Sequence, residues 1–211
     1  MRFSASIQCF TPFFYPNIST EKVPYLLMMA DPTPMSPDVL YPLSFMRSSL
    51  NMPRLSYEKI DATDMPEPYR SLLVHEGDMT SRLEGHHECP VKVNRLRSSN
   101  NGKLYFREVM LLTQDNDSPT EYGAIEVNLG TLPEEVRELV LQARQPLGGI
   151  LNDHRVPYSS APRAFLKIIP DGPIVEAFGT IEADHLYGRS NVISGYNGDV
   201  IAQIVEILPP L

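Results

Sequence analysis

Tryptophan is absent from this chain of 211 residues, and cysteine occurs only twice, at Cys9 and Cys89. Two cysteines so far apart exclude a disulfide framework and a zinc knuckle. Positive charge is also scarce, because 18 lysines and arginines face 26 aspartates and glutamates and leave a net charge of −8. Nucleic-acid-binding proteins normally carry a basic surface, so neither DNA nor RNA is expected as the main partner.

Long apolar runs are missing as well. No stretch reaches the ~18 apolar residues that a membrane-spanning helix needs, so no membrane span is predicted. Near the start, Pro12, Pro16 and Pro24 interrupt the chain before the apolar core of a secretory signal can form. Unpaired cysteines without an export signal predict a cytoplasmic location.

Proline is concentrated in the first third of the chain, where ten of the 20 prolines precede residue 70. Proline interrupts helices and removes hydrogen-bond donors from strands. Residues 1–65 are therefore predicted to form an irregular, proline-rich extension, in which pieces such as Tyr25–Ala30 and Val39–Leu43 pack on the rest of the protein. A lid over a ligand pocket is the alternative for this extension. Residues 66–211 are predicted to form the folded domain.

Three helices are predicted within this domain. Asp78 is expected to cap the N-terminus of the second helix. Thr131 and Glu134 are expected to form a capping box for the third helix, which Pro146 ends. The first two helices are predicted over residues 66–76 and 79–84.

Strands account for most of the remaining domain. Asn101-Gly102 and the segment 195–199 are strong hairpin signals, each between two apolar runs. Strands arranged in hairpins, with few and separated helices, predict an α+β fold: a single domain with a mostly antiparallel sheet flanked by a few helices. The predicted strands cover residues 91–97, 103–113, 121–129, 164–169, 187–194 and 200–208.

Several motifs resemble catalytic or metal sites but do not meet their requirements. The segment 86–89 (His-His-Glu-Cys), together with His75, lacks a second group at ligand spacing, so a solvated loop is favoured over a metal site. Asp153-His154 and Ser159-Ser160 lack the nucleophile elbow of a serine hydrolase. Gly148-Gly149 suits a close backbone approach to a ligand or the start of a short helix. No metal or cofactor is therefore expected.

Arg107 lies in the middle of an apolar strand, on the same face as Tyr105, Val109 and Leu111. A guanidinium in such surroundings is costly unless an anion meets it. Its planar fork suits a carboxylate. An acid on a neighbouring strand and a ligand carboxylate both satisfy this requirement, and the pattern leaves the choice open.

Glu206 presents the same problem with the opposite charge, because it shares a strand face with Ala202, Ile204 and Leu208. A carboxyl there is expected to have a raised pKa or a donor as partner, which is an environment used for acid–base chemistry. A structural Arg107–Glu206 pair is the competing interpretation. Arg189 is less constrained and also suits an exposed turn.

Four segments, in the same order, resemble the chorismate lyase family, whose members share a fold with UTRA ligand-sensing domains. The resemblance covers about residues 66–210. It is carried by residues 76–84 (EGDMTSRLE), 104–111 (LYFREVML), 146–148 (PLG), and 187–190 (YGRS) followed by 205–209 (VEILP).

The resemblance implies a chorismate pyruvate-lyase, which eliminates pyruvate from chorismate and leaves 4-hydroxybenzoate, for ubiquinone or other aromatic biosynthesis, without a cofactor. It implies that Arg107 holds a substrate carboxylate and that Glu206 lies beside the ring hydroxyl and takes or relays the ring proton. Backbone groups of two residues would hold the ligand, and either of two further arginines would meet the second carboxylate. The site residues expected in this way are Met79, Arg82, Arg107, Leu147, Gly148, Arg189 and Glu206.

Two alternatives remain beside the lyase. One is a non-catalytic, UTRA-like domain that senses a small carboxylate, and the other is a related lyase acting on a different enolpyruvyl or aromatic precursor. Sensor domains of this kind usually follow a DNA-binding winged helix, for which residues 1–65 show neither the basic charge nor the helices. This favours the enzyme at the level of sequence.

Overall fold

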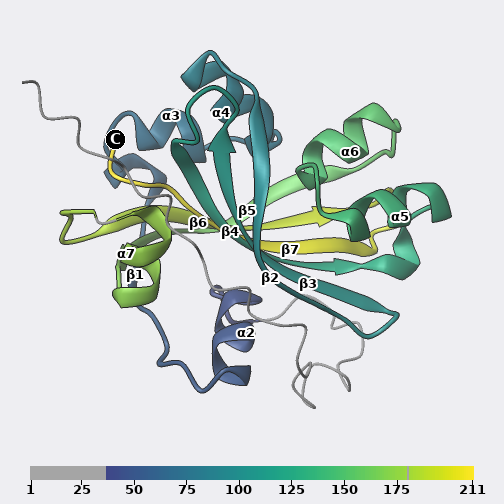
Figure 1. Ribbon diagram of the computed structural model, residues 1–211, viewed down its shortest axis with the longest axis horizontal. Coiled ribbons are helices and arrows are strands. Elements are labelled where there is room, and N and C mark those ends of the chain that lie inside the picture. The colour runs from purple at the N-terminus through teal and green to yellow at the C-terminus, as the bar shows by residue number, and fades with distance from the viewer. Residues whose placement is uncertain (1–36, 180) are drawn as a thin grey trace, which may run out of the picture.

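A strongly twisted β-sheet with helices on both faces forms the protein (Figure 1), and the computed structural model describes residues 37–179 and 181–211. In this described part the sheet has seven strands in the order β1-β5-β6-β7-β4-β3-β2, and every neighbouring pair is antiparallel. The predicted α+β fold with an antiparallel sheet is confirmed. The strands are β1 (Ser56–Ile60), β2 (Val91–Asn100), β3 (Leu104–Thr113), β4 (Pro119–Asn128), β5 (Ser159–Ile169), β6 (Leu186–Ser194) and β7 (Val200–Ile207).

Both predicted hairpins are confirmed. Between β2 and β3, the backbone N–H of Asn101 donates to the carbonyl of Leu104 over 3.2 Å, and Gly102 takes a φ of +89° that favours glycine. Between β6 and β7, the N–H of Gly195 donates to the carbonyl of Asp199 over 2.9 Å. These turns set the register that aligns the pocket-facing residues of neighbouring strands.

Strand β5 is longer than predicted, because it begins at Ser159 rather than at residue 164. Proline cannot donate a hydrogen bond to a strand ladder, yet β5 continues through Pro162. The structure accommodates this proline beside a shift of register between Pro162 and Ala164, opposite β6. A β-bulge of this kind lets the strand continue past the proline.

The three predicted helices correspond to α3, α4 and α5 with different lengths, and the structure also contains α2, α6 and α7. Asp78 caps α4 as predicted, since its carboxylate accepts from the N–H of Ser81 over 2.8 Å. The capping box is wrong: Thr131 lies in a 3-10 turn and donates its hydroxyl to Asn128. The helices are α2 (Leu43–Ser49), α3 (Tyr69–Leu73), α4 (Met79–His87), α5 (Glu134–Gln142), α6 (Leu147–Asp153) and α7 (Gly172–Phe178), with 3-10 turns at Ala62–Asp64 and Leu129–Thr131.

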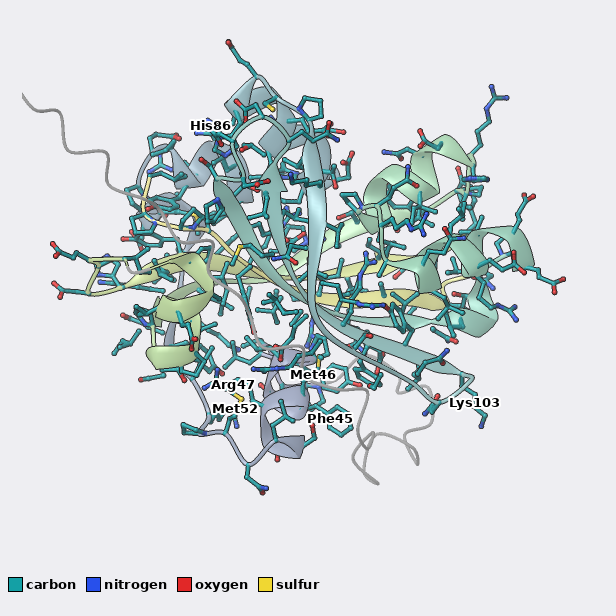
Figure 2. The ribbon with its side chains drawn as sticks, viewed as in Figure 1. Phe45, Met46, Arg47, Met52, His86 and Lys103 are labelled. Carbon is teal, nitrogen blue, oxygen red and sulfur yellow. The ribbon has the colours of Figure 1, made fainter. Side chains whose placement is uncertain are left out.

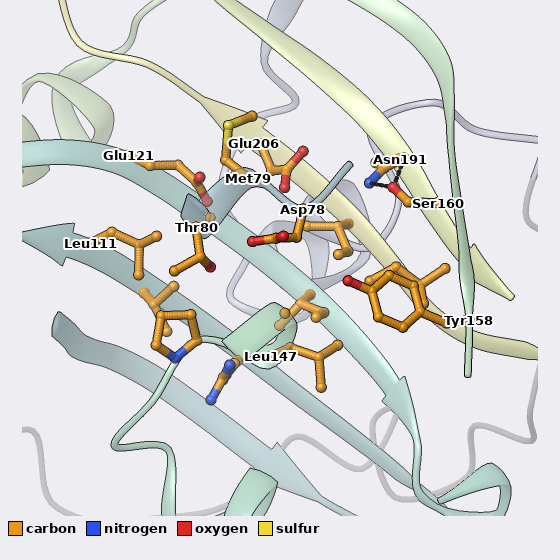
Figure 3. Close-up of a pocket in the computed structure, with 18 residues that line it drawn as sticks. Asp78, Met79, Thr80, Leu111, Glu121, Leu147, Tyr158, Ser160, Asn191 and Glu206 are labelled. Carbon is orange, nitrogen blue, oxygen red and sulfur yellow. Dashed lines mark hydrogen bonds between the residues drawn. The ribbon is translucent and has the colours of Figure 1, made fainter. Parts of the chain in front are cut away.

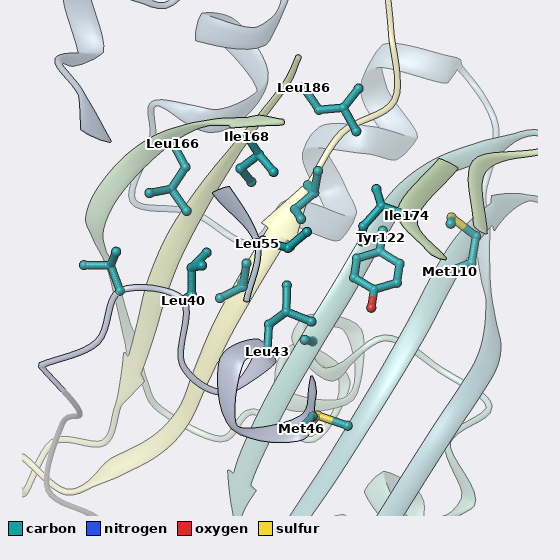
Figure 4. Packing of buried hydrophobic residues seen from close by; sticks show 14 of the residues in the cluster. Leu40, Leu43, Met46, Leu55, Met110, Tyr122, Leu166, Ile168, Ile174 and Leu186 are labelled. Carbon is teal, nitrogen blue, oxygen red and sulfur yellow. The ribbon is translucent and has the colours of Figure 1, made fainter. Parts of the chain in front are cut away.

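One face of the sheet is covered by α2 and α7 over a large apolar cluster. Leu43 of α2 and Ile174 of α7 are fully buried there, next to Tyr122 of β4 (Figure 4). Phe45 of α2 packs its ring 5.3 Å from that of Phe106 on β3, and Figure 2 labels the side chains of α2 beside the sheet. This face is therefore closed by packing.

The other face carries two separate apolar clusters. One lies under α5 and α6, and the other lies under α3 and α4. Leu147 and Ile204 belong to the first cluster, while Met79 and Val109 belong to the second. The boundary between these clusters is where the candidate site is found.

The predicted extension is part of this fold as far as the structure describes it. Strand β1 pairs with β5, placing Tyr57 opposite Ile168, and Leu40 and Leu43 are buried in the cluster under α2. The expectation that Val39–Leu43 packs on the rest of the protein is confirmed. The expectation of irregular structure is wrong for residues 37–65, because their apolar side chains fill the core despite the prolines. Residues 1–36, including the piece Tyr25–Ala30, lie outside the described residues.

None of the helices in the described part is both long and apolar enough to cross a membrane. Cys89 is a free, half-buried thiol, and Cys9 lies outside the described residues. The cytoplasmic location stays a prediction.

Candidate functional site

A cavity of about 60 Å³ lies between the sheet and the first turns of α4 and α6 (Figure 3). One water molecule needs roughly 10–15 Å³ of such volume, so the cavity has room for several waters. Its apolar wall comes from both clusters, and its polar groups come from the start of α4, from strands β3 to β7, and from the loop before β5. The polar residues that line it are Asp78, Thr80, Arg107, Glu121, Tyr158, Ser160, Asn191 and Glu206.

Arg107 provides a buried cation at this cavity. Its side chain is 2% exposed, its Nη2 donates to the carbonyl of Gln145 over a long 3.4 Å, and the hydroxyl of Tyr105 lies close to its guanidinium. Nε and Nη1 are buried and have no partner among the described residues. Burial lowers the pKa of the Arg107 guanidinium, because the charged form loses its hydration. The site therefore holds a cation whose donors are largely unused.

Glu206 occupies another part of the same cavity, and its partner is Arg189. The two residues face each other across β6 and β7, and Arg189 donates from Nε to the Glu206 carboxylate. Arg189 also donates to the carbonyls of Leu73 and His75, each over 3.1 Å. These contacts hold the guanidinium behind Glu206, where it orients the carboxylate without lining the cavity.

Glu121 is a second acid at the cavity, and it is not among the residues predicted from the sequence. It lies near the start of β4, is 5% exposed, and its Oε2 is buried without a partner among the described residues. Burial raises the pKa of Glu121 well above its ordinary value, and the nearby Glu206 raises it further. The signal that would have found it is the strand alternation that revealed Glu206, because Glu121 shares a face with Gly123 and Ile125.

A wider hollow of about 460 Å³ lies outside the cavity, and Asp78, Tyr158 and Ser160 line both spaces. Asn152 of α6 links two of these residues. Its amide donates to Asp78 over 3.3 Å and accepts from the hydroxyl of Tyr158 over 3.0 Å. A ligand that passes from the outer hollow to the cavity meets this hydrogen-bonded group first.

His75 lies behind the acidic part of the site. Burial and, to a lesser degree, the neighbouring Arg189 lower its pKa from 6.5 to about 4. The imidazole is therefore neutral near pH 7. His75 therefore adds no positive charge beside that of Arg189, whose guanidinium contacts Glu206.

No protein-family model matches the chain, and no curated protein matches it in sequence. Among solved structures, it is similar to PhnF from Mycobacterium smegmatis, with a TM-score of 0.51 and 11% identity over 64% of this chain and 65% of that chain. The effector domain of PhnF matches with a TM-score of 0.49 and 11% identity over 63% and 88% of the two chains. A GntR-family transcriptional regulator from Bacillus cereus matches with a TM-score of 0.43 and 15% identity over 57% and 92%.

This chain shares its fold with PhnF. The expectation of a UTRA-like α+β fold is thereby confirmed. At 11% identity the likeness shows the fold alone, and one fold can carry unrelated functions. Membership of the chorismate lyase family stays a prediction, as none of these neighbours is described as such an enzyme.

The structure brings most of the predicted site residues together. Five of the seven line the cavity, Arg189 lies behind Glu206, and Arg82 is exposed on α4 outside the lining. The interpretation of Arg107 and Glu206 as a structural pair is wrong, because Glu206 is paired with Arg189 and no ion pair of the described part includes Arg107. The alternative of Arg189 as an exposed turn residue is also wrong, since it is fully buried. The five residues in the lining are Met79, Arg107, Leu147, Gly148 and Glu206.

The remaining sequence motifs show no sign of a metal site or of a catalytic serine. His86 is exposed at the outer part of α4 (Figure 2), and among the described residues no group of three or more His, Cys, Asp or Glu is placed to hold a metal ion. Ser160 lines the cavity but accepts a hydrogen bond from Asn191 over 3.0 Å. The lid interpretation finds no support in residues 37–65, none of which lines the cavity. For residues 1–36 it falls outside the described residues.

Proposed function

We propose that the cavity binds a small ring carboxylate, with the carboxylate on Arg107 and the ring against the apolar wall. The observation that supports this most directly is the buried guanidinium of Arg107, whose Nε and Nη1 have no partner among the described residues. A buried cation without an anion is unfavourable, and a charge-assisted hydrogen bond stabilises by about 1.5–3 kcal/mol. A carboxylate that enters the cavity gains these bonds and removes the penalty.

The lining favours a flat, apolar ring between two polar regions. Val109 and Ile125 come from the sheet, and Leu147 comes from the first turn of α6. Arg107 and Glu206 lie on β3 and β7, which flank β4. Their positions are about 10 Å apart across the sheet and roughly 7 Å apart along the strands, by ordinary strand spacing. A ligand carboxylate at Arg107 thus places the far side of its ring toward Glu206.

Calorimetric titration with benzoate and 4-hydroxybenzoate tests this proposal. The wild type is expected to bind, and Arg107→Met is expected to weaken binding by about 2 kcal/mol, roughly thirty-fold, because the charge-assisted bonds are lost. Arg82→Met is the matched control, since Arg82 lies outside the cavity, and it is expected to bind as the wild type does. Absence of binding in the wild type, or equal binding by Arg107→Met, would contradict the proposal.

A second candidate function is catalytic: the elimination of pyruvate from chorismate. It is favoured by one further observation, namely that Met79, Arg107, Leu147 and Glu206, to which the resemblance assigns ligand contacts, all line one cavity. Such convergence from α4, β3, α6 and β7 is not required by the fold itself.

In this reaction the ring loses the proton at the carbon that bears its hydroxyl, and the bond from the ring to the enolpyruvyl oxygen breaks. The ring becomes aromatic, and the released enolpyruvate takes up a proton to become pyruvate. Arg107 would hold the ring carboxylate, and the carboxylate of Glu206 would accept from the ring hydroxyl and take or relay the ring proton. A ligand that displaces the water from this cavity would strengthen both contacts.

Incubation with chorismate, with pyruvate and 4-hydroxybenzoate followed over time, separates the two candidates. Catalysis predicts both products from the wild type and a large loss of rate in Glu206→Gln, with Glu58→Gln on the exposed strand β1 as control. Binding of 4-hydroxybenzoate without turnover of chorismate would exclude the lyase and leave a ligand-binding domain. Undiminished turnover in both Arg107→Met and Glu206→Gln would exclude this site.

A further inference from the structure

Glu121 and Glu206 form a pair of acids at one side of the cavity. In the sheet, Gly123 of β4 lies opposite Glu206 of β7, so Glu121 is the diagonal neighbour of Glu206 on the same face. Figure 3 shows the carboxyl groups of both residues directed to the region beside Met79. The two carboxyl groups interact, because the charge of Glu206 raises the pKa of Glu121.

The glycine between them gives a second indication of how Glu121 is placed. A Cβ at Gly123 would lie 2.9 Å from Oε1 of Glu121 and 3.3 Å from a methyl carbon of Val109. The carboxyl of Glu121 therefore folds back over Gly123, toward the strand position that faces Glu206. A side chain at position 123 would displace it.

Among residues 37–179 and 181–211, Arg189 is the one cation that contacts this pair. Arg189 donates to Glu206 and not to Glu121, whose Oε2 has no partner among the described residues. One guanidinium neutralises one carboxylate, and a second buried carboxylate next to the first would be strongly unfavourable. The arrangement is balanced when Glu206 is ionised and Glu121 carries a proton.

We propose that Glu121 is a specificity-determining residue: as a neutral acid it donates a hydrogen bond to a hydroxyl group on the ring carboxylate, while ionised Glu206 accepts one from the same hydroxyl. This inference rests on the proposed binding of a ring carboxylate and adds which substituent the site selects. A hydroxyl both donates and accepts, so it matches the pair of acids. An unsubstituted ring satisfies neither group, and a methoxy group cannot donate to Glu206.

The charge state of Glu121 depends on its surroundings. Burial and the neighbouring carboxylate raise the pKa of Glu121, and Arg189 opposes this shift to a lesser degree. Loss of the proton would remove the donor, so selection of the hydroxyl is expected at low pH and is lost as the pH rises through the pKa of Glu121. The charged and titratable groups that line the cavity with Glu121 or lie directly behind it are Glu206 on β7, Arg189 on β6, Arg107 on β3, Asp78 before α4, His75 after α3 and Tyr158 before β5.

The test compares the affinity ratio of hydroxybenzoate to benzoate in several variants, using calorimetry with 3- and 4-hydroxybenzoate, 4-methoxybenzoate and benzoate. The wild type is expected to bind either 3- or 4-hydroxybenzoate about ten-fold more tightly than benzoate. It is expected to bind 4-methoxybenzoate no more tightly than benzoate. Glu121→Gln keeps a neutral donor and is expected to keep most of this ratio. Glu121→Met removes the donor at similar volume and is expected to bring the ratio close to one. Glu58→Gln serves as the exposed control.

The pH profile gives a readout that a merely structural role would not produce. As the pH rises above 4.5 and through the raised pKa of Glu121, the wild-type ratio is expected to fall, whereas the ratio of Glu121→Gln stays flat. A ratio in Glu121→Met equal to that of the wild type, or the same pH profile in wild type and Glu121→Gln, would overturn the role of Glu121. Failure of every benzoate to bind the wild type would instead overturn the proposed function itself.

Discussion

Arg107 and Arg189 show how differently the protein treats two buried guanidinium groups. Arg189 donates to Glu206 and to two backbone carbonyls, so its charge is compensated inside the protein. Arg107 has one long hydrogen bond, and two of its nitrogens have no partner in the described part. The first group is structural, and the second is available to a ligand anion.

This contrast predicts opposite effects on stability. Arg107→Met removes an uncompensated buried charge at similar volume, so the free energy of unfolding is expected to stay the same or to rise by about 1 kcal/mol. Arg189→Met leaves Glu206 as an unpaired buried carboxylate and is expected to cost about 3–5 kcal/mol. Urea denaturation of both variants measures the difference. An equal loss in the two variants would show that Arg107 is also compensated within the fold.

Glu121 predicts a pH dependence of stability that can be measured without a ligand. Its pKa in the folded protein lies above the unfolded value of about 4.5, so folding favours the protonated form. Its contribution is complete below pH 4.5 and is lost as the pH rises through the folded-state pKa. Relative to Glu121→Gln, the wild type is therefore expected to lose stability as the pH rises above 4.5. Parallel denaturation profiles of the two proteins from pH 4 to 8 would contradict this.

At the scale of elements, the pairing of β6 with β7 places Glu206 against Arg189. Gly188 of β6 lies opposite Ile207, and a Cβ at this glycine would collide with the carbonyl oxygen of Glu206. The close approach of the two strands thus depends on glycine. Gly149 of α6 differs, because nothing lies within 4 Å of the Cβ it would carry.

These two glycines give a matched pair of predictions. Gly188→Ala is expected to destabilise the protein by about 1–3 kcal/mol, because backbone atoms of β7 must move to avoid the new methyl group. Gly149→Ala is expected to stabilise it by about 0.5–1 kcal/mol, because alanine loses less entropy than glycine in a helix. Thermal and chemical denaturation measure both values. A stable Gly188→Ala variant would mean that β6 and β7 can separate without cost.

At the scale of the whole molecule, the segment 37–65 belongs to the core rather than to an appendage. It supplies an edge strand and helix α2, and Leu43 is fully buried among residues of β3, β4 and β7. The face of the sheet opposite the cavity is closed by this segment and by α7. Since the pocket-facing side chains project from the same strands, the packing on one face supports the site on the other.

A cavity-creating substitution tests this integration. Leu43→Ala is expected to cost about 2–5 kcal/mol, as is usual for truncation of a buried leucine. Leu50→Ala, in the same segment but 43% exposed, is expected to change the stability by much less. Urea denaturation of the two variants measures both changes in the free energy of unfolding. A small loss of stability in Leu43→Ala would indicate that α2 does not complete the core.

The sequence predicted the site where a strong local signal existed. Arg107 and Glu206 were recognised because each interrupts an apolar strand face. Glu121 carries the same signal but stands near the predicted start of its strand, next to a turn and a glycine, where alternation is short. Alternation also cannot separate acids at the cavity from those on the closed face, where Glu108 is paired with Arg97 and Glu126 accepts from Gln203.

The sequence by itself determined the hairpins, the antiparallel sheet and the presence of a cation and an acid on apolar strands, because these features follow from turn residues and from alternation along single strands. Only the tertiary structure decided that Glu206 is paired with Arg189, that Arg107 has unused donors, and that Glu121 stands next to Glu206. These relations depend on the register between strands distant in sequence and on the meeting of α4 and α6 above the sheet. Few positive charges are buried in the described part of this acidic chain. The order of its strands pairs Arg189 with Glu206 and leaves Arg107 for a ligand.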